Sequence, residues 1–191
     1  MAKEKEDRVI IGLTSLPGGG KDYVADLLVK EYGFSKVSPG DILRKMIRKS
    51  GTGRITRESQ QKIQDEYRRE YGDDYVMELC YREILASRKT RFVIPGIRFP
   101  RDAEFYRSKP DCRFINVYIN APKKLRYERL TERKREDAPR SYSEFLRQDA
   151  NEKDMFNLEK TKKTSDFILN NGENESSRLK KNLERILSTV I

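Results

Sequence analysis

The sequence VIIGLTSLPGGGKDY, residues 9–23, joins a run of apolar residues to a glycine-rich turn and a single lysine. A short apolar run bounded by turn residues is typical of a buried strand. The pattern that follows, over residues 21–32, places apolar side chains on one face of a helix. This order of strand, glycine-rich turn, lysine and amphipathic helix predicts that the turn binds phosphate.

The turn has the residue types that a phosphate-binding loop requires. Successive glycines let backbone N–H groups point at one anion, and the following helix adds the positive end of its dipole. We expect the backbone of this loop to hold the phosphates of ATP, and the Lys21 ammonium to neutralise the outer ones. The loop residues are Pro17, Gly18, Gly19 and Gly20.

The segment departs from the usual pattern GxxxxGK[ST] at two positions. Ser15 stands in place of the first glycine, and Asp22 stands in place of the serine or threonine whose hydroxyl holds Mg²⁺. Because hard cations prefer oxygen ligands, we expect Asp22 to bind Mg²⁺ directly or through water. Asp22 and Tyr23 complete the predicted ATP-binding segment.

Length and pattern favour one α/β domain spanning residues 1–191, since no linker rich in glycine, serine or proline divides the chain. Short apolar strands alternate with helical segments, which is typical of a parallel sheet with helices on both faces. We expect three layers around five strands. The predicted strands are residues 8–14, 34–37, 91–94, 113–119 and 166–169.

Two helical stretches are longer than a simple crossover needs, at about residues 39–87 and 121–160. Long insertions in such folds often close over ligands. We therefore expect an acceptor-binding region in the first stretch and a lid in the second.

Composition narrows the chemistry. The chain has 41 Lys and Arg, 31 Asp and Glu, a net charge of +10 and no His. The positive charge favours anionic partners, and the absence of His excludes imidazole-based catalysis. The two cysteines lack the spacing of a zinc site or a disulfide framework. No run approaches the roughly 18 apolar residues of a membrane span, and the start MAKEKEDR has no apolar signal core, so we expect a cytoplasmic protein without membrane contact.

The sequence resembles the nucleoside monophosphate kinases of the P-loop group almost from end to end. Adenylate kinases carry a Gly-Asp-x-Leu-Arg segment that grips the acceptor nucleotide, and this chain has SPGDILR at residues 38–44. After the next strand those kinases have Asp-Gly and an Arg, where this chain has PGIR at residues 95–98. The resemblance implies that Asp41, Arg44 and Arg98 bind the acceptor.

The later part of the chain extends the resemblance. RLTER at residues 129–133 matches the segment that precedes the kinase lid, which implies that Arg129 and Arg133 neutralise the phosphates of ATP during transfer. The layout is similar to archaeal adenylate-kinase-related proteins that are likened to dephospho-CoA kinase, which share a late Asn-x-Gly. By this resemblance Asn171 borders the base of ATP, although the asparagine also suits a strand end.

The GKD at residues 20–22 is similar to animal phosphomevalonate kinases and phage deoxynucleoside monophosphate kinases. All of these relatives phosphorylate a substrate that already bears phosphate. The resemblance implies an ATP-dependent kinase that uses ATP and Mg²⁺ and a small anionic acceptor. The acceptor is of the nucleoside monophosphate or dephospho-CoA type, or alternatively a phosphorylated mevalonate. A phosphate acceptor needs no general base; for a hydroxyl acceptor Asp41 is the candidate, unless it caps a helix beginning at Ile42.

Pro95 is a departure from the resemblance, because the relatives place a magnesium-organising carboxylate at that strand end. Our hypothesis is that Asp22 compensates for the missing carboxylate. A different class of function, a nucleotide-dependent RNA-binding or assembly factor, is favoured by the net charge of +10. However, the sequence shows no basic stripe interleaved with stacking aromatics, so we do not expect nucleic acid as a partner.

Overall fold

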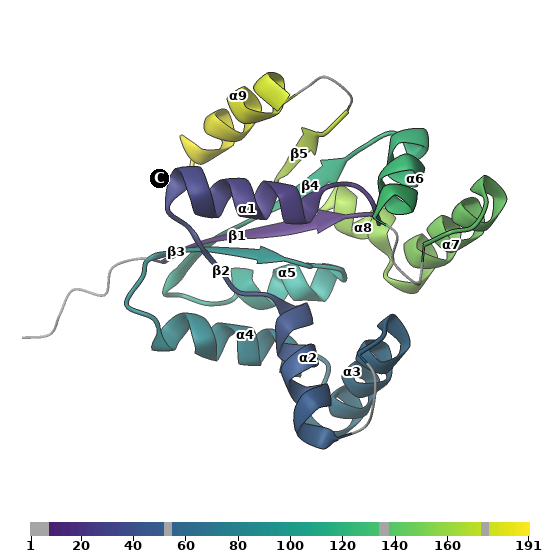
Figure 1. Ribbon diagram of the computed structural model, residues 1–191. Coiled ribbons are helices and arrows are strands. Elements are labelled where there is room, and N and C mark those ends of the chain that lie inside the picture. The colour runs from purple at the N-terminus through teal and green to yellow at the C-terminus, as the bar shows by residue number, and fades with distance from the viewer. Residues whose placement is uncertain (1–7, 52–54, 134–137, 173–175) are drawn as a thin grey trace, which may run out of the picture.

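Parallel strands form the centre of the molecule (Figure 1). The computed structural model describes residues 8–51, 55–133, 138–172 and 176–191. The strands form one five-stranded parallel sheet, which confirms the predicted sheet, and the structure adds the strand order β2-β3-β1-β4-β5. They are β1 (Arg8–Ser15), β2 (Ser35–Lys36), β3 (Arg91–Pro95), β4 (Cys112–Asn120) and β5 (Phe167–Asn170).

The edge strand β2 is shorter than predicted. Residues 34–37 were expected to form it, but only Ser35 and Lys36 pair with β3. Phe34 and Val37, on either side, are buried in the two cores. The apolar pattern therefore predicted that these residues are buried, but it overestimated the length of the strand.

Helices cover both faces of the sheet (Figure 1), which confirms the predicted three layers. Because neighbouring side chains of a strand point to opposite faces, Ile11 packs with α1 and α9, whereas Ile10 packs with α4 and α5. None of the helices in the described ranges has the length and apolar composition that a bilayer-spanning segment requires. The helices are α1 (Lys21–Tyr32), α2 (Pro39–Ser50), α3 (Arg57–Tyr71), α4 (Tyr75–Ala86), α5 (Pro100–Arg107), α6 (Lys123–Glu132), α7 (Tyr142–Met155), α8 (Leu158–Lys163) and α9 (Ser176–Leu187).

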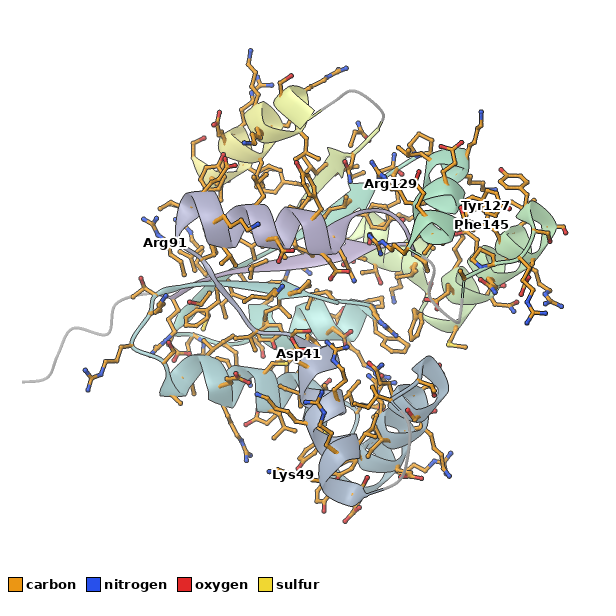
Figure 2. All side chains as sticks on the ribbon, in the orientation of Figure 1. Asp41, Lys49, Arg91, Tyr127, Arg129 and Phe145 are labelled. Atoms are coloured by element: carbon orange, nitrogen blue, oxygen red, sulfur yellow. The ribbon has the colours of Figure 1, made fainter. Side chains whose placement is uncertain are left out.

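The carboxyl ends of the strands meet at one edge of the sheet because all five strands run in the same direction. In parallel α/β sheets, ligands bind outside this edge. Here α2 and α3 lie on one side of it and α6 and α7 on the other (Figure 1). Tyr127 of α6 packs against Phe145 of α7, with 5.7 Å between the ring centroids (Figure 2).

Part of the predicted acceptor-binding region belongs to the body of the fold. Within residues 39–87, α4 packs against the sheet through Val76, Cys80 and Ile84, which are at most 2% exposed. The helices that extend from the sheet edge are α2 and α3.

Candidate functional site

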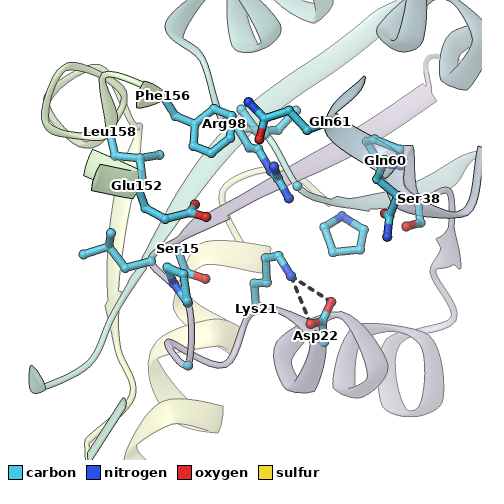
Figure 3. Close-up of a pocket in the computed structure, with 18 of the residues that line it drawn as sticks. Ser15, Lys21, Asp22, Ser38, Gln60, Gln61, Arg98, Glu152, Phe156 and Leu158 are labelled. Atoms are coloured by element: carbon cyan, nitrogen blue, oxygen red, sulfur yellow. Dashed lines mark hydrogen bonds and ion pairs between the residues drawn. The ribbon is translucent and has the colours of Figure 1, made fainter. Parts of the chain in front are cut away.

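A cavity of about 750 Å³ lies at the carboxyl edge of the sheet (Figure 3). It is bordered by the β1–α1 loop, α2, α3, the segment after β3, and residues of α6 and α7. Most of the predicted site residues line it together. These are Pro17, Gly18, Gly20, Lys21, Asp22, Arg44, Arg98 and Arg133.

The β1–α1 loop requires glycine at two of its positions. Gly18 and Gly20 have φ angles of 77° and 97°, in the left-handed region that side chains rarely adopt. A Cβ atom at Gly18 would lie 2.5 Å from the carbonyl oxygen of Arg126, and one at Gly20 would lie 2.1 Å from Asn171 Nδ2. The loop is therefore packed tightly against the segments that lie behind it.

Helix α1 begins directly after this loop. Its N-cap residue is Gly20, which provides no side-chain cap. The N–H groups in the first turn of a helix lack partners within the helix, and their dipoles favour an anion. The start of α1 is therefore suited to bind a phosphate group next to Lys21.

Lys21 and Asp22 form an ion pair at the mouth of the loop. Lys21 Nζ lies 3.1 Å and 2.9 Å from the two carboxylate oxygens of Asp22 (Figure 3). Burial lowers the pKa of Lys21, against the opposing effect of Asp22, and the charges of Arg98 and Arg133 lower it further. Burial alone would raise the pKa of Asp22, but the charges of Lys21, Arg133 and Lys36 outweigh it, so this pKa is lowered. The pair is therefore ionised beside other cations.

Arg129 and Asn171 lie behind the loop rather than in the cavity. The Asn171 side-chain amide donates to the carbonyl oxygen of Gly19 at 2.9 Å. Arg129 Nη1 donates to the carbonyl oxygens of Gly18 at 3.5 Å and Asn171 at 3.2 Å. Arg129 lies on α6, as labelled in Figure 2. Both side chains thus hold backbone carbonyls of the loop, and neither lines the cavity; Tyr23 does not line it either, being 48% exposed.

Arg126 is a supporting residue that the sequence analysis missed. Its guanidinium is 3% exposed and donates to Pro17 O at 3.2 Å and to Ala121 O at 3.2 Å. It also binds the buried carboxylate of Asp149 on α7 through contacts of 2.5 Å and 3.1 Å. Arg126, which lies on α6, therefore connects the β1–α1 loop to α7.

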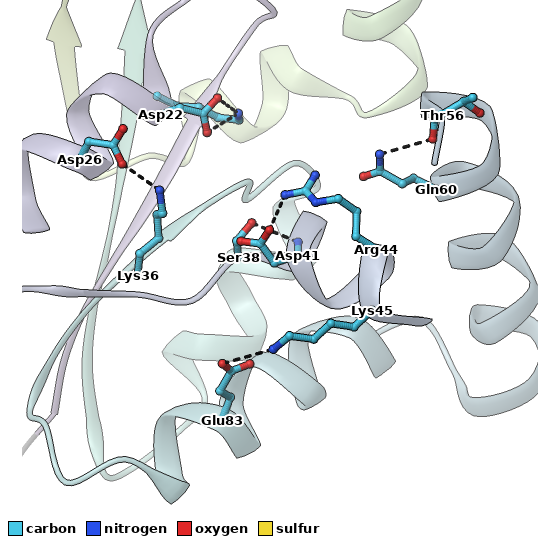
Figure 4. Close-up of polar contacts among 11 residues, drawn as sticks. Asp22, Asp26, Lys36, Ser38, Asp41, Arg44, Lys45, Thr56, Gln60 and Glu83 are labelled. Atoms are coloured by element: carbon cyan, nitrogen blue, oxygen red, sulfur yellow. Dashed lines mark hydrogen bonds and ion pairs between the residues drawn. The ribbon is translucent and has the colours of Figure 1, made fainter. Parts of the chain in front are cut away.

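On the opposite side of the cavity, α2 presents Arg44. The hydroxyl of Ser38 accepts the N–H of Asp41 at 3.3 Å and caps α2, which begins at Pro39. The prediction that Asp41 caps a helix beginning at Ile42 was wrong, because Ser38 is a good cap and Pro39 suits the first turn. The Asp41 carboxylate instead binds the Arg44 guanidinium (Figure 4), and Asp41 does not line the cavity.

Arg98 reaches the cavity from the segment after β3. Its guanidinium lies over the ring of Phe156, 4.7 Å from the centroid. Its backbone N–H and that of Phe99 both donate to Asp102 Oδ2 at 2.9 Å. Arg98 and Arg133 are near enough to Lys21 to affect its pKa. Three cations from separate elements therefore converge on one cavity.

Several cavity residues were not found from the sequence. The carboxylates of Asp102, Asp149 and Glu152 line the cavity, as do three glutamines of α3. The only signal for any of them was the spacing of the glutamines, since two of them are four positions and three positions from the third and so are its neighbours on the helix surface. They are Gln60, Gln61 and Gln64.

Comparison with known proteins finds relatives that cover most of the chain. Residues 11–152 match a protein-family model described as an AAA domain. A UPF0200 protein from Methanothermobacter thermautotrophicus is 34% identical over 180 residues, which are 94% of this chain and 89% of that protein. Another UPF0200 protein, from Pyrococcus horikoshii, is 33% identical over 188 residues, covering 96% and 98% of the two chains.

Among solved structures, shikimate kinase from Acinetobacter baumannii in complex with shikimate matches with a TM-score of 0.56 at 22% identity. The match covers 96% of each chain. At this identity the likeness shows the fold alone, a P-loop α/β fold with strand order 2-3-1-4-5. The chain has this fold, contains the AAA domain over residues 11–152, and belongs to the UPF0200 family.

Proposed function

We propose that this protein is an ATP-dependent kinase that transfers the γ-phosphoryl group to a small metabolite already bearing phosphate. The observation that carries the proposal is the convergence of Lys21, Arg98 and Arg133 on the cavity beside a glycine-rich loop. Like charges that are partly buried repel one another and lose hydration, and an anion that binds among them compensates this cost in free energy. A polyphosphate donor and a phosphorylated acceptor together supply this negative charge.

Each side chain has a role in this proposal. The loop N–H groups and Lys21 hold the outer phosphates of ATP, and Arg133 neutralises charge that develops on the transferring group. Arg44 and Arg98 bind the acceptor phosphate, since the planar guanidinium meets two phosphate oxygens at once and keeps its charge. An acceptor phosphate is already ionised, so this transfer requires no general base and leaves Asp41 to orient Arg44.

The structure favours supporting roles for two residues that were predicted to touch ATP. Asn171 and Arg129 bind the carbonyl oxygens of Gly19 and Gly18. The N–H of Gly19 donates to the carbonyl oxygen of Leu16 at 2.9 Å, and Gly19 does not line the cavity. With the carbonyls of Gly18 and Gly19 bound behind the loop, the N–H groups of Gly18, Gly20 and Lys21 are proposed to bind the donor phosphates. We infer that both residues position the loop.

The residues at the cavity mouth fit a Mg²⁺ ion that arrives with ATP. Mg²⁺ is commonly bound through one or two carboxylates together with substrate phosphates and water. The Asp22 carboxylate is 53% exposed next to Lys21 and meets this requirement. The described residues contain no cluster of three or more acidic, Cys or His side chains that could hold a metal alone. When bound, Mg²⁺ would supply charge neutralisation to the phosphates, with Asp22 as its protein ligand.

The Mg²⁺ requirement tests this role. The Asp22→Ala variant is expected to need about tenfold more Mg²⁺ for half-maximal ADP release, because the only proposed carboxylate ligand is lost and no hydroxyl replaces it. Asp26→Ala is the matched control, since Asp26 lies one turn later on α1 and pairs with Lys36 at 2.8 Å. An unchanged Mg²⁺ dependence in Asp22→Ala would refute the compensation of Pro95 by Asp22.

The affinity for ATP is expected to fall as the pH rises into the alkaline range. Because the pKa of Lys21 is lowered, this fall should begin at a lower pH than for a lysine with the usual pKa of 10.5. Burial lowers the pKa of Lys21 from its usual 10.5 in the free protein, so Lys21 is in part neutral between the lowered value and 10.5. Phosphate oxygens favour the charged form, and ATP binding in this window therefore takes up protons. Calorimetry in two buffers of different ionisation enthalpy measures the uptake. Equal uptake in Lys21→Arg, which stays charged, would contradict the assignment.

The activity itself is tested by a coupled assay of ADP release. The wild-type protein is incubated with ATP, Mg²⁺ and one acceptor at a time from nucleoside monophosphates, dephospho-CoA and phosphorylated mevalonates. We expect one of these acceptors to stimulate ADP release. Tight binding of RNA without any acceptor-stimulated ADP release would favour the RNA-binding alternative.

A further inference from the structure

The wall that α3 contributes to the cavity is polar but uncharged. More than half of the residues of α3, RESQQKIQDEYRREY, are charged. The residues that α3 places in the cavity are nevertheless Gln60, Gln61 and Gln64. Charged residues such as Lys62 and Glu66 are exposed elsewhere on the helix. The contact face of α3 therefore differs in chemistry from the rest of the helix.

These glutamines keep hydrogen-bonding capacity that a ligand can use. The side-chain amide of Gln60 donates to Thr56 O at 3.3 Å, and that of Gln61 lies 3.2 Å from the Met155 sulfur. Within the described residues, no partner is found for the amide oxygens of Gln60 and Gln61 or for the amide of Gln64. An amide offers both a donor and an acceptor without charge, so these side chains suit a neutral group that also presents both.

A buried carboxylate lines the same cavity. Asp102 is 2% exposed, and its Oδ2 atom accepts the N–H groups of Arg98 and Phe99. Its Oδ1 atom is buried and has no hydrogen-bond partner among the described residues. A buried acceptor without a partner costs free energy, and a ligand that donates a hydrogen bond there would recover it.

Asp102 faces the same side of α3 as the glutamines. Arg68 follows Gln64 by one helical turn, and it is near enough to Asp102 to act on its pKa. Burial raises this pKa, and the N–H groups of Phe99 and Arg98 and the charges of Arg68 and Arg101 oppose the rise. The unpartnered carboxylate oxygen and the amides thus belong to one region of the cavity.

We propose that this region binds a nucleobase carried by the acceptor, with Asp102 Oδ1 accepting a hydrogen bond from an amino or ring N–H group. The glutamines of α3 pair with neighbouring donors and acceptors on the base edge, in the way that carboxylates and amides read bases elsewhere. Leu43, Met77 and Ile97 also line the cavity and offer apolar surface to the ring. This inference rests on the proposed function, since the base must belong to the phosphorylated acceptor.

The proposal selects among the acceptor classes. A phosphorylated mevalonate carries a carboxylate and a hydroxyl group but no N–H donor. Next to Asp102 its carboxylate would meet a like charge, and it has no base edge with which the glutamines of α3 could pair. A nucleotide brings both the phosphate for Arg44 and Arg98 and the donor for Asp102.

The test compares acceptors with and without a base, by calorimetric titration of the full chain in the absence of ATP. The ligands are AMP, CMP, GMP, UMP, ribose 5-phosphate and 5-phosphomevalonate. We expect at least one nucleotide to bind about tenfold or more tightly than ribose 5-phosphate. In Asp102→Asn the side-chain oxygen still accepts the two N–H groups, and an NH₂ replaces the unpartnered oxygen. This variant is expected to lose about tenfold in affinity for that nucleotide and to bind ribose 5-phosphate within about twofold of wild type.

Two further variants complete the test. Glu104→Gln makes the same carboxylate-to-amide change at an exposed position of α5 and is expected to leave every affinity unchanged. Gln64→Leu removes an amide without touching the Arg98 segment and is expected to weaken only the nucleotide. An equal loss for nucleotide and ribose 5-phosphate in Asp102→Asn, no preference for any nucleotide, or tightest binding of 5-phosphomevalonate would each overturn the proposal. Failure of the kinase proposal itself would instead appear as absent ADP release, which these titrations do not measure.

Discussion

Replacing Lys21 with Met is expected to lower the rate of acceptor-stimulated ADP release by about 100- to 1000-fold, the usual cost of removing one group that stabilises charge in a transition state. Lys21 directly follows the glycine-rich loop, and its ammonium lines the cavity. Methionine keeps most of the volume of the side chain and removes the charge. Coupled detection of ADP, with saturating ATP and acceptor, measures the loss.

The matched control for this variant is Lys30→Met, on the exposed side of the same helix α1. It removes the same charge and should keep the wild-type rate. If Lys21→Met retained the wild-type rate, the donor phosphates would not lie on the β1–α1 loop, and the proposed function would be wrong.

Replacing Arg126 with Met is expected to lower the free energy of unfolding by about 3–5 kcal/mol, because it leaves the buried Asp149 carboxylate without its main cation. Both side chains of this pair are 3% exposed. The Lys153 ammonium, 3.8 Å from Asp149, replaces only part of the lost interaction. Chemical denaturation of the wild type and the variant measures the difference.

Two controls separate burial from charge. Lys45 and Glu83 form an exposed pair at 3.8 Å, and Lys45→Met is expected to change the free energy of unfolding by less than about 1 kcal/mol. The double variant Arg126→Met with Asp149→Leu should recover much of the lost stability, since apolar side chains can replace a buried pair. It should still bind ATP more weakly than wild type, because Pro17 O has lost its donor. Equal effects of Arg126→Met and Lys45→Met would contradict the structural role of the buried pair.

The five parallel strands and the helices on both faces could be predicted from the sequence, because apolar runs and helical stripes indicate which residues are buried. The position of Ser15 to Lys21 between a strand and a helix was correct for the same reason. The order of the strands in the sheet could not be predicted, since it depends on how the connections pack. The residue that caps the start of α2 was harder to predict. There the sequence has an acid at Asp41 that is a plausible cap, and only the backbone path shows that Ser38 performs this role.

Cavity residues could be predicted where they belong to one continuous segment of the chain. They were harder to predict where the fold brings distant segments together. The segment KKLRYERLTER, residues 123–133, contains three arginines, and their roles depend on neighbours far away in sequence. Arg126 is buried because Pro17 and Asp149 surround it, whereas Arg133 remains at the cavity. From the sequence, Asp102 is an ordinary carboxylate in the first turn of a helix. Its place in the cavity depends on α3, which only the fold brings near it.

The buried pair of Arg126 and Asp149 also constrains how the protein can move. Because Arg126 joins α6, α7 and the β1–α1 loop, a rotation of these helices that kept its contacts intact would move the loop with them. A change in the width of the cavity would then require α2 and α3 to shift relative to α6 and α7, and the contact between Gln61 and Met155 would change with that shift. If the proposed function holds, α2 and α3, which contribute to the acceptor site, would move during each reaction, and the part of the site that binds ATP would keep its shape.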